Sequence, residues 1–135
     1  MKTPQPRLAS TMTPFPYSVD IDAPLSEARR MIATHEFHHL PVTAGGNVVG
    51  IVHGEDLDEA AAGGVRDHYR PAVYIVDIET PLAEVLASMA ERHVDAAVVM
   101  RHGRLAGVFT TTDACKSFAA LLDAIWPGPG EDWVA

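Results

Sequence analysis

The chain has 135 residues, of which 47% are hydrophobic, so it can build one packed core but is too short for two independent domains. Its 18 acidic residues outnumber the 10 basic ones, and the formal charge of -8 repels nucleic-acid phosphates and anionic lipid, so we expect neither as a partner. Cys115 is the single cysteine, and neither a signal-peptide run nor a stretch of about 18 apolar residues is present, which predicts a cytoplasmic protein.

The first half of the chain changes its hydrophobic period several times, which predicts a strand, a helix, two strands and a second helix. Apolar runs rich in β-branched residues indicate strands, and apolar residues three or four apart indicate a helix. The elements are a strand at residues 17–21, a helix from Pro24 with the stripe Leu25, Ala28 and Ile32, a hairpin of residues 40–42 and 48–52, and a helix at residues 57–62 before Gly63 and Gly64.

The second half predicts the same five elements in the same order. Pro81 suits the first turn of a helix, and His102 with Gly103 supplies a hairpin turn. The elements are a strand at residues 72–78, a helix with the stripe Leu82, Val85 and Met89, strands at residues 96–100 and 105–109, and a final helix at residues 115–126.

The two halves are copies of one unit. Shifted by 57 positions without a gap, the chain matches itself, and a fixed period of this kind indicates repeats. The identical pairs include Pro14 and Pro71, Tyr17 and Tyr74, Asp20 and Asp77, Pro24 and Pro81, Leu25 and Leu82, Val42 and Val99, Gly50 and Gly107, and Asp56 and Asp113. One unit alone would bury too little surface to be stable, so we expect the two to share a core.

Four short motifs make the chain resemble the CBS domain family, whose members usually occur as a tandem pair called a Bateman module. They are Met12-Thr13-Pro14, the segment 39–42, and the closing segments 50–56 and 107–113. The resemblance implies an α+β fold in which two β-α-β-β-α repeats pack pseudo-symmetrically. We expect the first repeat at residues 8–64, the second at residues 65–126, and a C-terminal tail at residues 127–135.

The resemblance also implies two clefts between the repeats, each able to hold an adenosine-containing ligand. In the first, Asp113 would accept hydrogen bonds from ribose hydroxyls, and Thr110 and Thr112 would meet a phosphate at the helix N-terminus. Carried over position by position, the other walls of this Asp113 cleft are Thr13, Ser18, Phe37, His38 and Val108.

The second cleft, around Asp56, departs from the family pattern. His53 replaces the hydroxyl residue, and Glu55 places a negative charge where a phosphate would lie. His38 and His39, however, stand where some nucleotide-binding relatives have basic phosphate contacts. Because its ribose and helix-start positions are intact, the Asp113 cleft is the expected site. AMP, ADP or ATP is the expected ligand.

The aspartates and histidines also have explanations that need no ligand. Asp56 and Asp113 stand where helices are predicted to start, so each could be a plain N-cap. Four histidines, at positions 35, 38, 39 and 53, lack the ligand spacing of a zinc motif, so no metal site is expected.

Two functional hypotheses remain, and neither is enzymatic, because no catalytic motif is present. In the first, the chain is a regulatory module that senses an adenine nucleotide, acts on a regulated partner protein and forms a homodimer. In the second, the clefts are vestigial and the helical faces serve dimerisation or protein docking. The apolar stripe Phe118, Leu121, Leu122 and Ile125 is interpreted as core or as a dimer seam.

Overall fold

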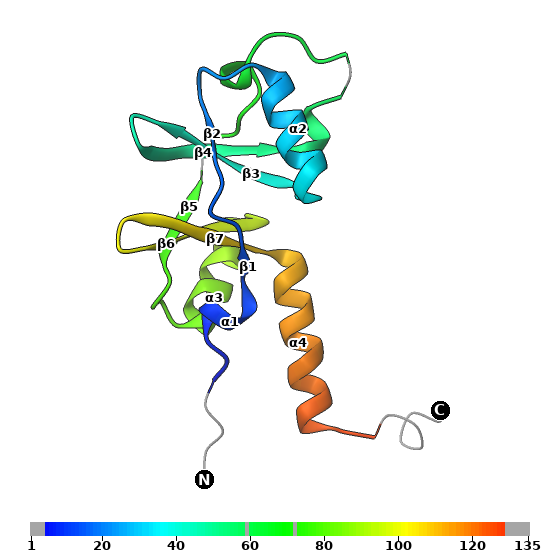
Figure 1. Ribbon diagram of the computed structural model, residues 1–135. Coiled ribbons are helices and arrows are strands. Elements are labelled where there is room, and N and C mark those ends of the chain that lie inside the picture. Colours follow the sequence, from blue (N-terminus) through cyan, green and yellow to red (C-terminus); the bar gives the residue numbers. More distant parts are fainter. Residues whose placement is uncertain (1–4, 59, 72, 129–135) are drawn as a thin grey trace.

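The computed structural model describes residues 5–58, 60–71 and 73–128, and it divides into two halves that each contain a sheet (Figure 1). The first half holds the sheet β2-β3-β4, and the second holds the sheet β1-β7-β6-β5. The elements are α1 (Leu8–Thr11), β1 (Thr13–Pro14), β2 (Val19–Asp20), α2 (Leu25–His35), β3 (His39–Ala44), β4 (Asn47–His53), β5 (Tyr74–Asp77), α3 (Leu82–Arg92), β6 (Ala96–Arg101), β7 (Arg104–Thr110) and α4 (Thr111–Ile125), with short 3-10 turns at Gly54–Asp56 and Val65–Asp67.

The predicted α+β fold of two similar repeats is confirmed. In each half a strand, β2 or β5, pairs in parallel with the first strand of an antiparallel hairpin, and a helix of 11 residues connects them. Pro24 and Pro81 are the N-cap residues of α2 and α3, so each helix begins one residue later than predicted. The predicted tail, residues 127–135, lies outside the described residues except for its first two.

The prediction of a helix at residues 57–62 is wrong. The chain makes a single 3-10 turn at Gly54–Asp56, and the described residues that follow it up to Ala62 belong to no helix. The Ala61 N–H donates to the Asp58 carbonyl at 3.1 Å in an isolated turn, and the carbonyls of Asp58 and Ala61 also accept bonds of 2.9 and 3.0 Å from the guanidinium of Arg29 in α2. His53, at the N-cap of this turn, makes no side-chain cap bond, so the turn lacks the capping box that Thr110 and Asp113 form in the second repeat.

Each repeat sends the segment before its first strand across to the other repeat's hairpin. Thr13 in β1 faces Val108 in β7, and 57 positions later Arg70 forms a bridge with Ile51. The crossing backbone runs so close that a Cβ added to Gly107 would lie 2.3 Å from the carbonyl oxygen of Thr13. At Gly50 the corresponding distance to the carbonyl oxygen of Arg70 is 2.4 Å, so both crossings require glycine.

The two halves share a core, as the alternation of side chains along β6 shows. Ala96 and Val98 pack with Leu40, Val52 and the other core residues of the first repeat. The intervening Ala97 and Val99 face the opposite way, into the core of the second repeat. The inner face of the second sheet is therefore buried by the first repeat, which places the ends of both hairpins at the boundary between the halves.

Candidate functional site between the two repeats

Asp113 lies in a closed arrangement at the start of α4. Thr110 is the N-cap and Asp113 the third helical residue of a capping box, in which the Thr110 backbone N–H donates to Asp113 Oδ2 at 3.0 Å and the Asp113 N–H donates to Thr110 Oγ1 at 3.2 Å. Across the boundary, Thr13 Oγ1 donates to Asp113 Oδ1 at 3.0 Å. Asp113 is only 7% exposed, and these donors from the protein supply the hydrogen bonds that a buried carboxylate needs.

The predicted wall residues of this cleft are only partly brought together. Thr13 and Val108 are register partners. Phe37 is 8% exposed and stacks on Phe15, with ring centroids 3.9 Å apart and planes at 16°, so one of its faces is already covered. Ser18 is half-buried beside β2, and Thr112 lies exposed on the first turn of α4.

Asp56 lies in an open arrangement around Arg70. The Arg70 guanidinium donates to both carboxylate oxygens of Asp56, at 3.0 and 3.1 Å, and to Glu55 at 3.0 Å. The hydrogen bond from Arg70 lowers the pKa of the Asp56 carboxyl from its ordinary value. The same bond raises the pKa of Arg70, so this pair is ionised at neutral pH.

Sequence reasoning missed Arg70. A signal was present, since the offset of 57 positions that pairs Asp56 with Asp113 also pairs Arg70 with Thr13. The structure places the two residues at equivalent points, each next to the aspartate of the other repeat.

A cavity of about 380 Å³ lies next to Arg70, between the repeats. Its apolar wall comes from Ile51, Val73, Val94 and Ala96, and its ionisable lining from His53, Arg70, His93 and Asp95. An apolar wall with a few convergent polar groups is the usual character of a small-molecule site. The arrangement can hold a flat apolar group and, at the same time, an anionic one.

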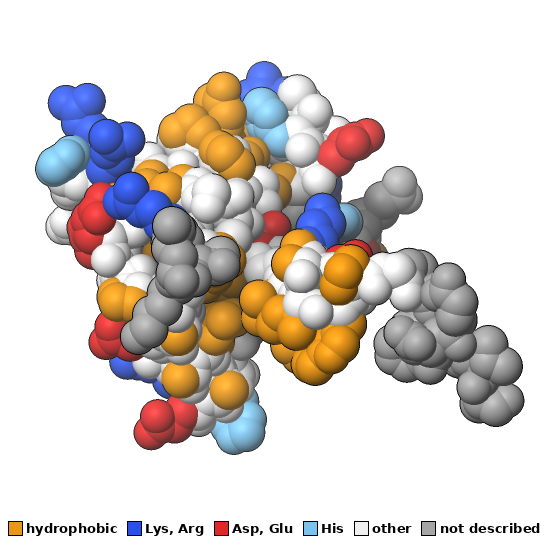
Figure 2. Space-filling model, turned by 90° about the horizontal axis from the view of Figure 1, so that it is seen from below, with side chains coloured by type: hydrophobic (Ala, Val, Ile, Leu, Met, Phe, Trp, Pro, Cys, Tyr) orange, Lys and Arg blue, Asp and Glu red, His pale blue; other side chains and the backbone are white. Residues whose placement is uncertain are grey.

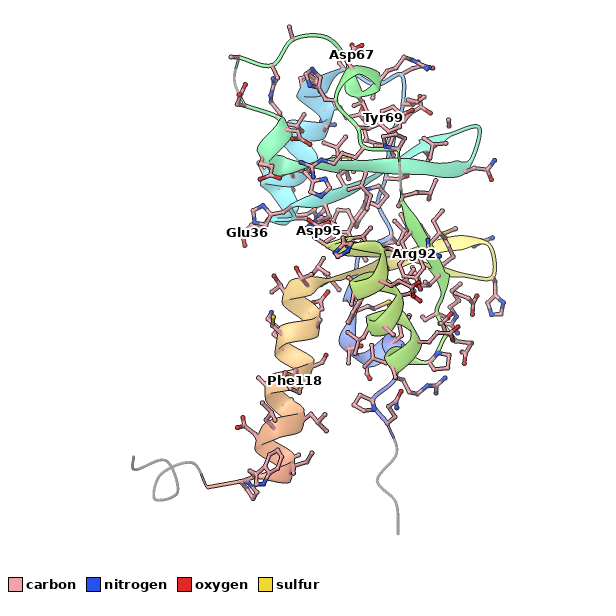
Figure 3. All side chains as sticks on the ribbon, turned by 180° about the vertical axis from the view of Figure 1, so that it is seen from behind. Glu36, Asp67, Tyr69, Arg92, Asp95 and Phe118 are labelled. Carbon is pink, nitrogen blue, oxygen red and sulfur yellow. The ribbon has the colours of Figure 1, made fainter. Side chains whose placement is uncertain are left out.

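His38 and His39, predicted as phosphate contacts, lie at the boundary with His53 and Asp95. A smaller cavity of about 200 Å³ is lined by these four residues together with Gly54 and Glu55. His39 Nε2 lies 3.3 Å from Asp95 Oδ2, and His53 Nε2 lies 3.3 Å from both Asp95 oxygens. Figure 3 shows Asp95 at this boundary.

Burial and the mutual contacts shift the pKa values of this cluster. Burial lowers the pKa of His39 from its ordinary value, although Asp95 acts in the opposite direction. For Asp95, burial alone would raise the pKa, but the hydrogen bonds from His39 and His53 outweigh it and lower the pKa. Asp95 is therefore a carboxylate at neutral pH, and His39 is held mainly as the neutral imidazole.

The family model of the CBS domain matches residues 8–63 and again residues 65–120. These two matches cover most of the chain, so the protein belongs to the CBS domain family and is a tandem pair of CBS domains. CBS-domain pairs are generally regulatory modules without catalysis of their own. No match was found among curated proteins.

Solved structures of CBS-domain pairs share the fold. The CBS domain pair of protein MJ0100, in complex with 5'-methylthioadenosine and S-adenosyl-L-methionine, has a TM-score of 0.75 at 20% identity and covers 87% of this chain and 99% of its own. A putative acetoin utilization protein (AcuB) from Vibrio cholerae has a TM-score of 0.71 at 19% identity, covering 92% and 98%. The CBS domain of a bacterial CNNM/CorC family Mg2+ transporter in complex with ATP has a TM-score of 0.70 at 21% identity, covering 84% and 87%.

Among the described residues, no helix combines the length and the apolar character that crossing a bilayer requires.

Proposed function

We propose that this chain is a regulatory module that binds an adenosine-containing ligand, with an adenine nucleotide (AMP, ADP or ATP) as the specific candidate, between its two CBS repeats. The observation that carries the proposal is the cavity of about 380 Å³ next to Arg70, to which both repeats contribute. Relatives with the same fold are described in complex with ATP or with S-adenosyl-L-methionine, which supports the ligand class.

Within this proposal the cleft around Asp56 is the better site for a phosphorylated ligand, which departs from the sequence-based preference for Asp113. Ile51, Val94 and Ala96 supply the apolar contact for a base, and Arg70 supplies a cation for phosphate. Arg70 currently binds two carboxylates, so moving its guanidinium to a phosphate would leave the Asp56 oxygens free for ribose hydroxyls. The Asp113 carboxylate, by contrast, must give up buried hydrogen bonds before it can bind a ribose.

A ligand in this cavity would act by holding the repeats together. His53 and Ile51 belong to β4 of the first repeat, whereas Val94 and Ala96 belong to the second. A ligand shifts a conformational equilibrium only by its difference in affinity between the two states. Contacts from both repeats provide that difference, which is what a regulatory module acting on a partner protein needs. The proposal includes a reducing, cytoplasmic location, in keeping with the free Cys115.

Isothermal titration calorimetry with AMP, ADP, ATP and S-adenosylmethionine tests the function. Asp56→Asn and Asp113→Asn form a matched pair, because each removes one charge at an equivalent position. We expect at least one adenosine ligand to bind. We expect Asp56→Asn to weaken ATP binding by about tenfold or more, because it loses one hydrogen bond to a charged group. If no ligand binds more tightly than about 1 mM, the sensing function is rejected. If Asp113→Asn alone weakens binding, the ligand occupies the other cleft.

A second candidate function, homodimerisation or protein docking through α4, rests on a different observation. The helix points away from the second sheet and carries an exposed apolar stripe (Figures 1 and 2). Phe118 is 61% exposed and Ile125 53% exposed, so the stripe is not core, and Figure 3 shows Phe118 on α4 away from the sheets. A cavity of about 430 Å³ between α3 and α4 continues this surface, lined by Leu82, Leu86, Phe118 and Leu121 among others.

Sedimentation velocity tests this second function, because it measures whether the protein is a monomer or a dimer. Phe118→Glu places a charge in the stripe, and Ala120→Glu adds the same charge on the opposite side of the exposed helix, as a control. We expect the wild type and Ala120→Glu to be dimers and Phe118→Glu to be a monomer. A wild type that is monomeric at all concentrations rejects the dimer.

A further inference from the structure

The cluster of His39, His53 and Asp95 is assembled from three separate parts of the chain. His39 begins β3 and His53 ends β4, and the two are register partners, so the hairpin holds them side by side with ring centroids 4.8 Å apart. Asp95 comes from the second repeat, between α3 and β6. One ligand atom from each of the three side chains lies within 4.8 Å of the other two.

Two of the three distances between these atoms match those around a metal ion, and the ligand atoms of the two histidines lie within 4.8 Å of each other. A tetrahedral ion with bonds of about 2.0–2.1 Å holds neighbouring ligand atoms about 3.3–3.4 Å apart. Here each histidine Nε2 lies 3.3 Å from Asp95 Oδ2. That separation is longer than the usual hydrogen bond to a carboxylate, which has its most common N···O distance near 2.9 Å.

The protonation states of the cluster also suit a metal. Metal ligands must be neutral imidazoles and ionised carboxylates. Burial lowers the pKa of His39, and hydrogen bonds lower that of Asp95 against the opposing effect of burial. His53 is only 7% exposed, and its Nδ1 has no hydrogen-bond partner among the described residues, so the bond to Asp95 accounts for one of its two ring nitrogens.

We propose that His39, His53 and Asp95 form a binding site for one divalent transition-metal ion, of the Zn²⁺ type, held between the two repeats. Two imidazoles select such ions over Mg²⁺ and Ca²⁺, which prefer oxygen ligands. His38 and Glu55 line the same small cavity of about 200 Å³ as the three ligands. The expectation of no metal rested on ligand spacing in one stretch of sequence, whereas this set spans residues 39–95 and both repeats.

The ion would tie the repeats together, because two ligands belong to one and the third to the other. Anything that binds the folded state and not the unfolded one raises the stability in proportion to the logarithm of its concentration over Kd. Zn²⁺ should therefore raise the melting temperature of the protein, and a chelator should reverse the effect.

The test is a titration of the full chain, stripped with a chelator, with Zn²⁺ alone and with no nucleotide present, so that it stands apart from the proposed nucleotide binding. We expect one Zn²⁺ per chain, no binding of Mg²⁺ under the same conditions, and a Zn²⁺-dependent rise in melting temperature. Asp95→Asn and His39→Gln approximately keep the side-chain sizes and should lower the affinity for Zn²⁺ by about 100-fold or more. Loss of a group that only supports a metal ligand already lowers metal affinity by up to about 100-fold.

His102→Asn is the matched control. It removes an exposed histidine at the turn between β6 and β7, where the backbone has φ 50, a conformation that asparagine tolerates. Titration with Co²⁺ adds a geometric readout, since a four-coordinate site gives strong visible absorption that Asp95→Asn should abolish. The proposal is overturned if the wild type shows no saturable binding near one ion per chain, or if Asp95→Asn and His39→Gln bind Zn²⁺ as tightly as His102→Asn does. The cluster is then a hydrogen-bonded contact between repeats.

Discussion

The clefts around Asp113 and Asp56 are built from equivalent positions and yet differ in kind. On the Asp113 side, a threonine hydroxyl donates to the carboxylate, the residue is buried, and it lies in the first turn of a helix of 15 residues. On the Asp56 side, Arg70 donates to the carboxylate, the Asp56 side chain remains 30% exposed, and the described residues between it and β5 form no α-helix. Identical aspartates in two repeats can therefore have different roles, and the neighbouring residue decides which.

The physical difference lies in what each carboxylate would lose on binding a ligand. Asp113 would lose buried hydrogen bonds, and an unsatisfied buried group costs about 1–3 kcal/mol. Asp56 would lose an ion pair open to solvent, and such pairs contribute about 0–1 kcal/mol. Asp56 can therefore exchange Arg70 for a ligand at a lower cost in free energy than Asp113 can exchange its own partners.

The glycines at the two crossings should give the largest effect. Gly107→Ala forces a Cβ against the backbone of Thr13, Pro14 and Phe15, and we expect it to lower the free energy of unfolding by about 3 kcal/mol, the upper part of the overpacking range. Gly50→Ala should lower the free energy of unfolding somewhat less, because two of its three contacts are with the side chain of Tyr69, which can move more easily than backbone. Urea denaturation measures both. Gly54→Ala, whose nearest contacts are at 3.6 Å or more, is the control and should be nearly neutral.

The aspartates themselves should differ in stability. Asp113→Ala removes the capping box and leaves Thr13 without its acceptor, so we expect a loss of about 2 kcal/mol. Asp56→Ala breaks only the exposed contacts with Arg70 and should cost less than about 1 kcal/mol. Thermal denaturation of the two variants in parallel decides the matter. Equal losses would mean that the two clefts do not differ as described.

Arg70→Thr makes the Asp56 cleft resemble the Asp113 cleft. With the cation removed, we expect ATP to bind about tenfold more weakly, while adenosine binds almost unchanged, because Arg70 is assigned to phosphate. Calorimetric titration of both ligands against the variant gives the ratio. An equal loss for adenosine and ATP would show that Arg70 does not discriminate phosphate.

The smallest effect should be the pH dependence from His39. Its folded pKa lies below the ordinary value of 6.5, so between the two values the unfolded chain binds more protons. The stabilisation is complete above 6.5 and is lost as the pH falls through the folded value. Urea denaturation from about pH 8 to about pH 5 should show this loss, and His39→Gln should flatten it. Asp95, His53 and His38 face His39, so a steeper profile in the variant would point to one of them instead.

Much of the fold could be predicted because its signals are local or periodic. The stripe Leu82, Val85 and Met89 proved to be the buried face of α3, and the turns at Gly46 and Gly103 joined the predicted hairpins. The helix at residues 57–62 could not be excluded in this way. In the structure this segment is joined to α2 by Arg29, which is distant in sequence and donates to the carbonyls of Asp58 and Ala61.

The candidate site was predictable in part. Thr13 was placed in the Asp113 cleft by the family resemblance, and it does contact Asp113. The interpretation of Asp113 as a plain N-cap is wrong, because Thr110 is the N-cap and Asp113 is the third residue of the helix. Arg70 was overlooked although the repeat points to it, and the joining of Asp95 with His39 and His53 had no sequence signal at all. Contacts of that kind depend on how the two halves are packed.

The repeat and the order of most elements could be predicted from the amino-acid sequence, because hydrophobic period and local backbone preferences act over short distances along the chain. The requirement for glycine at the two crossings comes from the backbone of the other repeat and becomes visible only in the tertiary structure. The tertiary structure alone decided which aspartate is buried and which is paired with a cation, and which histidines meet a carboxylate. Those outcomes depend on side chains brought from the other repeat, where burial and charge act through space rather than along the chain.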